Sequence, residues 1–410
     1  MTGGLRRIAM VSMHTSPVNV PGTVDAGGMN VAMLAVATEL ARRGVEVDLL
    51  TRATSAPEER ELASGVTMRS LRAGPLEPIS KYRLVDVADD FGEAVAKLAG
   101  RPNPRYDLIH AHYWLSGLAT LPVAIELGIP FVQSFHTVGA MKNRVLAPGA
   151  EPEPEGRLRG EAFLGNQADA IVAGSAAEVM SLIDELHTPA EKLWVIPPGV
   201  DADLFTPDRA RNSAGIRTQL RLSPDRPLLV IAGRVQPLKD QELGIRILAE
   251  LQMVSPAPEL VIAGDADDAD YLASLRSLAA ELDVDQDVSF VGAIDRERMA
   301  DLFAAAEFTL VTSYSETFGL VALESAASGT PVIAYRGTGL VESVGEGESG
   351  YLLDSREPAD WAGAILQHRA DGERVAIMRR SARAFAEGFT WATSAASHLA
   401  LYETLVRSRD

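Results

Sequence analysis

Hydrophobic residues along the chain gather in short runs that alternate with longer amphipathic segments. In the first half, the runs are rich in Val and Ile and cover 6–13, 45–50, 106–112, 129–135, 168–175 and 192–199. Such runs are typical of strands buried on both faces of a parallel sheet. The intervening segments have helical periodicity, at 29–43, 84–98, 116–127, 157–167 and 176–187. This order predicts a parallel sheet covered by helices.

The same alternation starts afresh after a proline-rich stretch at 197–208. It predicts strands at 227–233, 259–264, 287–292, 308–313 and 331–335, and helices near 240–252, 270–282, 296–305, 319–328, 358–387 and 391–406. We therefore expect two doubly wound, Rossmann-like α/β domains, at 1–200 and 201–388, followed by a C-terminal helix at 389–410. Ligands of such sheets bind outside the carboxyl ends of the strands, so the active site should lie between the domains.

Composition narrows the class of protein. The 410 residues are 47% hydrophobic and 23% charged, as in a folded globular protein. Lys and Arg number 38 against 56 Asp and Glu, and the net charge of -18 argues against nucleic acid or anionic membrane as a partner. The absence of Cys excludes disulfides and thiolate chemistry. The apolar run 8–13 is too short for a signal sequence, and we expect a cytoplasmic protein.

Two segments are candidates for a phosphate site. Gly27 and Gly28 open the helix after the first strand, so a ligand could approach the backbone there and an anion could meet the helix N-terminus. Arg234 and Lys239 follow the first strand of the second half, where two cations would clamp a diphosphate. The alternatives are an ordinary tight turn at the glycines and two solvated cations near a loop. Neither a P-loop nor the dinucleotide glycine motif is present.

A third candidate is the segment 313–325. Thr317 is expected to be the N-cap of a helix, which would leave the N–H groups of the next residues for an anion. Carboxylates on either side would accept hydrogen bonds from sugar hydroxyls, so the segment suits a sugar nucleotide. As an alternative, the two glutamates serve the helix dipole and the protein surface. The residues are Glu316, Phe318, Gly319, Leu320 and Glu324.

No metal site is expected. His110 and His112 lie in a predicted strand and His136 in a turn, a spacing that does not suit metal ligation, and the acidic run 265–270 is expected to start a helix. A hydrolytic triad is also unsupported. The loop 151–156 is expected to be solvated, with an ordered active-site flap as the alternative.

Taken together, these segments resemble the retaining glycosyltransferases of family 4, which have the GT-B fold of two facing Rossmann-like domains. The Glu316 to Glu324 spacing is similar to that family's E-x7-E motif. Within the family, GGMNV, YDLIHAHYWLSG, HTVGAMKN and GRVQPLK resemble the members that open mycothiol biosynthesis. Those members transfer N-acetylglucosamine from UDP-N-acetylglucosamine to 1L-myo-inositol 1-phosphate. The resemblance implies small-molecule substrates, a nucleotide-sugar donor, no required cofactor and an actinobacterial source, and it leaves room for a homodimer.

The resemblance also implies site residues. On the donor side, the backbone of Gly28 would meet the diphosphate, Arg234 and Lys239 would neutralise the leaving phosphates, Glu324 would hold the ribose, and Glu316 and His136 would contact the sugar. The implied catalytic set is Arg234, Lys239, His136 and Glu316.

On the acceptor side, the resemblance implies that Asn30 contacts the inositol ring. Its phosphate would be held by Lys81, Tyr113, Thr137 and Arg157.

One departure leaves the donor base open. The family has an arginine against the nucleotide where this chain has Ile294. A related glycosyltransferase of lincosamide assembly uses a GDP-octose and the sulfur of ergothioneine, and this is the alternative; the retained phosphate-binding set favours the inositol phosphate. From other classes, a two-domain binding protein without catalysis and a dehydrogenase remain as weaker alternatives.

Overall fold

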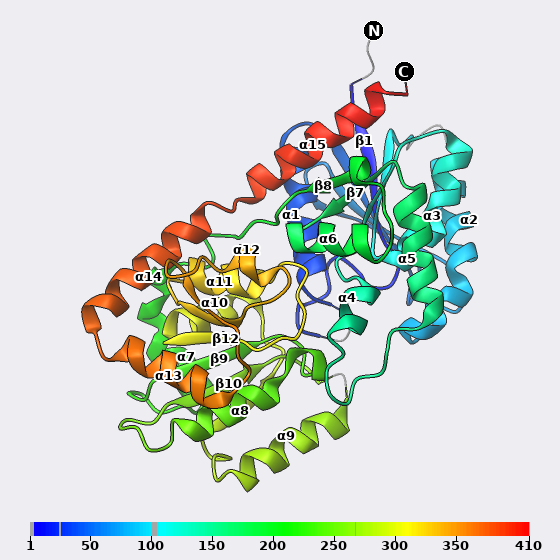
Figure 1. The fold of residues 1–410 in the computed structure, drawn as a ribbon. Helices are drawn as coiled ribbons and strands as arrows, with labels where there is room; N and C mark the ends of the chain where they lie inside the picture. Colours follow the sequence, from blue (N-terminus) through cyan, green and yellow to red (C-terminus); the bar gives the residue numbers. More distant parts are fainter. Residues whose placement is uncertain (1–3, 24–25, 101–104, 267, 410) are drawn as a thin grey trace.

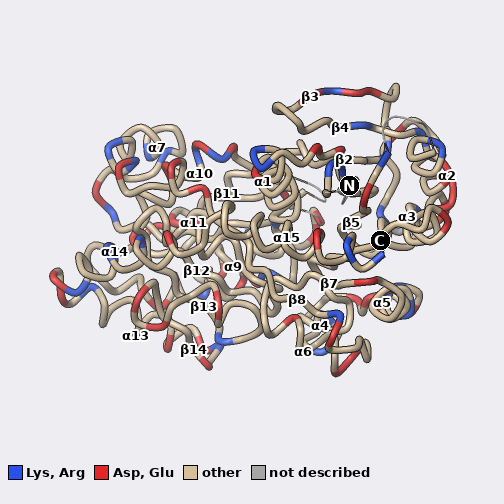
Figure 2. The backbone as a smooth tube through the Cα atoms, turned by 90° about the horizontal axis from the view of Figure 1, so that it is seen from above, with Lys and Arg blue, Asp and Glu red and all other residues tan. Residues whose placement is uncertain are grey.

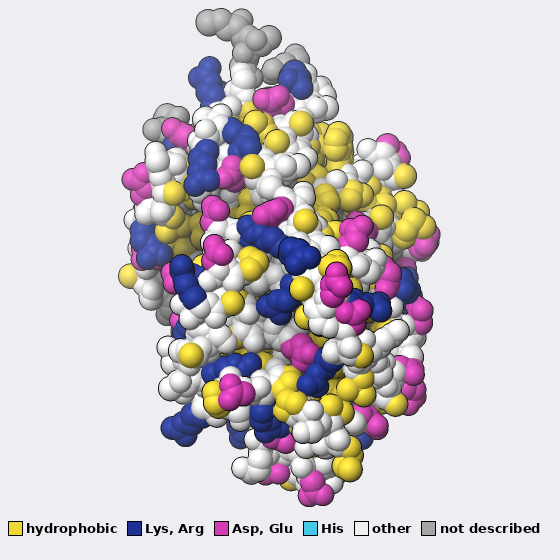
Figure 3. All heavy atoms as spheres, turned by 90° about the vertical axis from the view of Figure 1, so that its left-hand side faces the viewer, with side chains coloured by type: hydrophobic (Ala, Val, Ile, Leu, Met, Phe, Trp, Pro, Cys, Tyr) yellow, Lys and Arg dark blue, Asp and Glu magenta, His cyan; other side chains and the backbone are white. Residues whose placement is uncertain are grey.

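The computed structural model describes residues 4–23, 26–100, 105–266 and 268–409, and it consists of two α/β domains. The domains lie side by side, with N-terminal elements such as α2, α3 and α5 on one side and C-terminal elements such as α13 and α14 on the other (Figures 1 and 2). Lys, Arg, Asp and Glu positions are interspersed over both domains (Figure 2), and the face in Figure 3 likewise mixes both charges. The predicted fold class is confirmed.

The N-terminal domain is built on an eight-stranded sheet of order β3-β4-β2-β1-β5-β6-β7-β8. Pairing is parallel except between β3 and β4. The six predicted strands are present, but β3 and β4 were missed. β3 is largely exposed, and neither strand carries a continuous apolar run. The strands are β1 (Arg7–Ser12), β2 (Glu46–Arg52), β3 (Glu59–Ala63), β4 (Val66–Leu71), β5 (Leu108–His112), β6 (Phe131–Ser134), β7 (Ala170–Ala173) and β8 (Leu193–Val195).

Helices cover both faces of this sheet, as apolar residues on both faces of its strands require. One face packs with α2 and α3, which also contact each other, and the other packs with α1. The helices are α1 (Gly28–Arg42), α2 (Ala88–Ala99), α3 (Trp114–Leu127), α4 (Gly139–Arg144), α5 (Glu155–Gln167) and α6 (Ala176–Asp184), and the 3-10 helix η1 covers Lys81–Val87.

The C-terminal domain has a six-stranded parallel sheet of order β11-β10-β9-β12-β13-β14. Its strands are β9 (Leu228–Ala232), β10 (Glu259–Ala263), β11 (Val288–Gly292), β12 (Phe308–Val311), β13 (Val332–Tyr335) and β14 (Gly350–Leu353). Its helices are α7 (Ser213–Leu220), α8 (Gln241–Glu250), α9 (Ala269–Glu281), α10 (Arg296–Ala305), α11 (Leu320–Ala327), α12 (Leu340–Ser343), α13 (Pro358–Arg369) and α14 (Gly372–Glu387).

The predicted helix 358–387 is wrong in one respect, because it is two helices. The carboxylate of Asp371 accepts hydrogen bonds from the N–H groups of Glu373 and Arg374, and this cap starts α14 afresh.

The C-terminal helix α15 (Trp391–Arg407) crosses back to the N-terminal domain (Figure 1). It packs against α1, and its Leu401 and Tyr402 are buried in the same apolar cluster as Met10 and Val172 of the N-terminal sheet. At its end, Arg409 pairs with Asp169 just before β7. The chain therefore passes between the two domains twice, once near 197–208 and once before α15. None of the described helices is both long and apolar enough to span a membrane.

Candidate active site

A cavity of about 620 Å³ lies between the domains, where the carboxyl ends of β1, β5 and β6 face those of β9 and β12. All the residues assigned above to the donor or the acceptor line this cavity. They are Gly28, Asn30, Lys81, Tyr113, His136, Thr137, Arg157, Arg234, Lys239, Glu316, Phe318, Gly319, Leu320 and Glu324. The structure thus brings the candidates together, and the individual roles stay predictions.

Gly28 lies against the C-terminal domain. A Cβ atom built on Gly28 would be 2.9 Å from Cδ1 of Leu320, the first residue of α11. The N-termini of α1 and α11 therefore approach each other from opposite domains. Two helix N-termini at one point present several N–H groups and two positive partial charges to a bound anion.

Lys239 and Glu316 form an ion pair within the cavity wall. The Lys239 ammonium donates to Glu316 Oε1, which also accepts a hydrogen bond of 2.8 Å from the Ser313 hydroxyl. Both side chains are partly buried. Since the carboxylate fixes the ammonium at the end of η4 (Pro237–Lys239), the cation is held in place before any ligand contact.

The expectation that Thr317 caps α11 is wrong. The helix starts after Gly319, whose φ of 100° is in the left-handed region that favours glycine. The Thr317 hydroxyl instead donates to the backbone oxygen of His136 in the other domain, at 2.8 Å. Its backbone oxygen accepts from the Ser175 hydroxyl at 2.6 Å. Thr317 therefore joins the domains rather than starting the helix, and Phe318 and Gly319 precede the helix.

Glu324 lies about one turn inside α11, and its Oε1 atom is 3.4 Å from Nη2 of Arg296. Burial raises the pKa of Glu324 to about 7, although Arg296 opposes the shift. The Arg296 guanidinium also lies over the Phe205 ring, 5.2 Å from its centroid. Ile294 is 6% exposed and lines the cavity. Arg296 therefore places a cation near Glu324.

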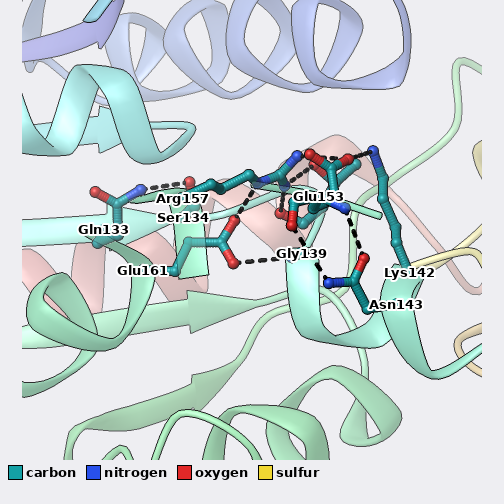
Figure 4. A network of polar contacts seen from close by, with 9 residues as sticks. Gln133, Ser134, Gly139, Lys142, Asn143, Glu153, Arg157 and Glu161 are labelled. Carbon is teal, nitrogen blue, oxygen red and sulfur yellow. Dashed lines mark hydrogen bonds and ion pairs between the residues drawn. The ribbon is translucent and has the colours of Figure 1, made fainter. Parts of the chain in front are cut away.

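Arg157 is the centre of a polar network on the acceptor side (Figure 4). Its side chain is 3% exposed; Nε donates to Glu161 at 2.7 Å, and Nη1 pairs with Glu153 at 3.0 Å. Nη2 donates to the backbone oxygen and hydroxyl of Thr137, at 2.8 and 2.9 Å. The guanidinium also lies 5.1 Å from the centroid of the Tyr113 ring. Arg157 thus contacts both Thr137 and Tyr113, two other predicted acceptor residues.

Asn30 braces a loop. Its amide donates to the backbone oxygen of Ser16 at 2.7 Å and to Thr15 at 3.3 Å, and its oxygen accepts from the N–H of Gly27 at 3.0 Å. The side chain is 1% exposed. Asn30 thereby shapes the glycine-containing loop around the cavity, and contact with an inositol ring remains a prediction.

The histidines form a buried chain from the cavity to α15. His112 Nδ1 lies 2.7 Å from Nε2 of His136, and His110 is hydrogen-bonded to Ser134 and to Tyr402 of α15. Burial lowers the pKa of His136 to about 3, so this ring is neutral at pH 7. Neutral His136 can hold a sugar hydroxyl, and it carries no charge with which to offset a phosphate.

Sequence analysis missed several polar residues of the cavity wall, among them His14, Lys142 and Glu153. The His14 and Tyr113 ring centroids are 4.3 Å apart, and burial lowers the pKa of His14 to about 3, with help from nearby cations. The position of His14 at the carboxyl end of β1 was a usable signal. Glu153 comes from the loop expected to be solvated, and it lies instead against Lys142 and Arg157.

In the described part of the chain, no group of three or more His, Asp and Glu side chains is placed to hold a metal ion. The acidic run at 265–270 contributes a helix cap, since Asp268 accepts from the N–H of Asp270 at 2.8 Å. Asp265 accepts from the N–H of Ala293.

Comparison with known proteins assigns the two domains to families. Residues 26–204 match the model of Glycosyltransferase Family 4, and residues 213–385 match that of Glycosyl transferases group 1. The D-inositol 3-phosphate glycosyltransferase of Acidothermus cellulolyticus is 40% identical over 98% of this chain and 91% of its own length. The chain belongs to this glycosyltransferase family. The namesake from Nocardia farcinica is also 40% identical, over 97% of this chain and 89% of its own.

Solved structures agree on the fold of this glycosyltransferase. Sucrose-phosphate synthase from Thermosynechococcus elongatus superposes with a TM-score of 0.87 at 30% identity, over 98% of this chain and 100% of its own. Anabaena HepE in complex with UDP and glucose has a TM-score of 0.75 at 22% identity, over 96% and 98% of the two chains. The latter likeness supports the two-domain fold alone.

Proposed function

We propose that this glycosyltransferase moves N-acetylglucosamine from UDP-N-acetylglucosamine to a hydroxyl of 1L-myo-inositol 1-phosphate, with retention at the anomeric carbon, as the first step of mycothiol biosynthesis in the cytoplasm. The observation that carries the proposal is that two sets of cations line one cavity from opposite domains. Arg234 and Lys239 belong to the C-terminal domain, and Lys81 and Arg157 to the N-terminal domain. A donor diphosphate and an acceptor phosphate would each find a cation pair.

The proposed mechanism needs no protein nucleophile. The acceptor hydroxyl attacks the anomeric carbon on the face that the nucleotide leaves, the bond from that carbon to the diphosphate oxygen breaks, and the departing phosphate takes the hydroxyl proton. Negative charge grows on the diphosphate in the oxocarbenium-like transition state. Arg234, Lys239 and the two helix N-termini would stabilise it, at about 3 kcal/mol for a key donor in a desolvated site.

Exclusion of water would protect the donor from hydrolysis. Direct hydrogen bonds across the cleft favour such closure. Besides those of Thr317, Glu342 accepts from the N–H of Ala176 at 2.6 Å, and the N–H of Asp265 donates to the backbone oxygen of Gly22 at 2.9 Å.

The experiment is incubation of the purified protein with a panel of UDP-, GDP- and ADP-sugars, with and without inositol phosphate. We expect release of UDP and a glycosylated inositol phosphate by mass spectrometry only when UDP-N-acetylglucosamine and the acceptor are both present. The alternative with a GDP-sugar and ergothioneine follows from Ile294, and its product in the same panel would replace the proposal. Donor binding without any nucleotide release would indicate a binding protein.

Lys81→Ala separates the two substrates. Lys81 lines the N-terminal part of the cavity and is the better choice, because removal of Arg157 would leave Glu161 buried beside no cation. We expect weaker binding of inositol phosphate with unchanged affinity for UDP, measured by calorimetry. Equal acceptor affinity in the variant would remove Lys81 from the acceptor site.

A further inference from the structure

Glu153 places a negative charge on the cations of the acceptor side. Its Oε1 atom lies 2.8 Å from Nζ of Lys142 and 3.0 Å from Nη1 of Arg157, and all three side chains line the cavity. Figure 4 shows the Glu153 carboxylate between these two cations. A carboxylate so placed makes the contacts that a phosphate oxygen would make.

Arg157 has a permanent partner apart from Glu153. Glu161 is 0% exposed, it pairs with Nε of Arg157 at 2.7 Å, and its second oxygen accepts from the N–H of Gly139 at 2.8 Å. That carboxylate belongs to α5 and pairs with Nε, whereas Glu153 pairs with Nη1. The charge of buried Arg157 is therefore balanced by Glu161, and Glu153 is a second carboxylate on the same guanidinium.

The backbone around Glu153 is held independently of its side chain. The N–H of Glu153 donates to Oδ1 of Asn143 at 2.8 Å, so the loop is fixed to α4 through the main chain. The side chain is 20% exposed, which leaves it room to rotate away from the two cations. Its carboxylate can therefore leave without unfolding the loop.

We propose that Glu153 is a specificity-determining residue that competes with the acceptor phosphate for Lys142 and Arg157. The carboxylate must give up these cations, or repel the incoming anion, when a phosphate binds. A monoanion gains too little from the exchange, whereas a phosphate dianion carries twice the charge and three oxygens. Because of this competition, an acceptor must bind the two cations more strongly than Glu153 does before it can occupy the site. Phosphorylated acceptors meet this requirement. This inference rests on the proposed function for the identity of the acceptor.

The test is calorimetry with two probes, inorganic phosphate and 1L-myo-inositol 1-phosphate. In Glu153→Gln, we expect both to bind about tenfold more tightly than in wild type, within the usual range of coupling between sites. Acetate serves as a third, monoanionic probe, and we expect its binding to be undetectable in wild type and measurable in Glu153→Gln. Glu155→Gln is the matched control, because Glu155 is exposed, two residues away, and pairs with Arg159. It should leave both affinities unchanged.

The direction of the change in phosphate affinity distinguishes competition by Glu153 from a supporting role. If Glu153 merely braced Lys142 and Arg157, its loss would weaken phosphate binding, so unchanged or weaker binding in Glu153→Gln overturns the proposal. Should the Gln variant fold poorly, Glu153→Ala is the second variant, and we expect it to bind phosphate more tightly as well. The inorganic phosphate arm does not depend on which acceptor is glycosylated. Tighter binding of phosphate together with no transfer to inositol phosphate would thus contradict the proposed function and support the role of Glu153.

Discussion

At the scale of single residues, the cavity combines fixed cations with carboxylates of different environments. Lys239 is paired with Glu316, and Glu324 is buried near Arg296. Sequence analysis placed Lys239 after one predicted strand and Glu316 and Glu324 in the segment after another, and the family resemblance joined them in one donor site. Their partners could not be predicted, since Arg296 reaches Glu324 only through the packing of α10 on α11.

Lys239→Ala should lower turnover by about two to three orders of magnitude, because one preorganised donor to the departing phosphate is lost. The measurement is the steady-state rate of nucleotide release. Arg246→Ala is the control, since Arg246 of α8 is exposed and pairs with Glu242. Retention of wild-type turnover in Lys239→Ala would show that this ammonium does not act on the leaving group.

Glu324 should make donor binding depend on pH. With its pKa raised to about 7, the group is mostly protonated at pH 6 and ionised at pH 8, and the ionised form is the better acceptor for ribose hydroxyls. KM for the donor should therefore rise about tenfold from pH 8 to pH 6. His14 and His136 do not titrate in this range, as burial lowers the pKa of each to about 3.

Two variants show which carboxyl group causes the pH dependence of the donor KM. Glu324→Gln should give a donor KM that is nearly constant from pH 6 to pH 8. Glu178 also lines the cavity and burial raises its pKa to about 7, so Glu178→Gln is the necessary control and should keep the wild-type profile. Loss of the profile in Glu178→Gln alone would transfer the role to Glu178.

At the scale of elements, sequence predicted those strands and helices whose apolar residues are buried in a regular pattern. The exposed strand β3 and the short helices α4 and α12 lack such a pattern. The start of α11 was misplaced because Thr317 is a good cap by residue type, and its hydroxyl is used instead by the other domain. Local preference was overridden by a contact between domains, which no window of sequence contains.

The C-terminal helix should stabilise the N-terminal domain. Leu401 of α15 is 0% exposed and packs in the cluster that contains Met10 and Val172. Leu401→Ala should lower the free energy of unfolding by about 2 to 5 kcal/mol. Urea denaturation measures this, with the exposed Thr404→Ala as the control. Equal stability of wild type and Leu401→Ala would mean that α15 is not anchored there.

At the scale of the whole molecule, function depends on two sheets whose carboxyl ends face one cavity. The repeated alternation of strands and helices predicted both sheets and the place of the site, because the parallel topology fixes the edge at which loops meet. It could not predict which loops touch across the cleft. The domain boundaries at 200 and 388, the donor sugar and the oligomeric state stay predictions.

The most direct measurement is a crystal structure of the protein with UDP and 1L-myo-inositol 1-phosphate bound. The account predicts the diphosphate between Gly28, Arg234 and Lys239, and the inositol phosphate beside Lys81 and Arg157 with the Glu153 carboxylate turned away. Density for either compound outside the cavity between the domains, at full occupancy, would contradict it.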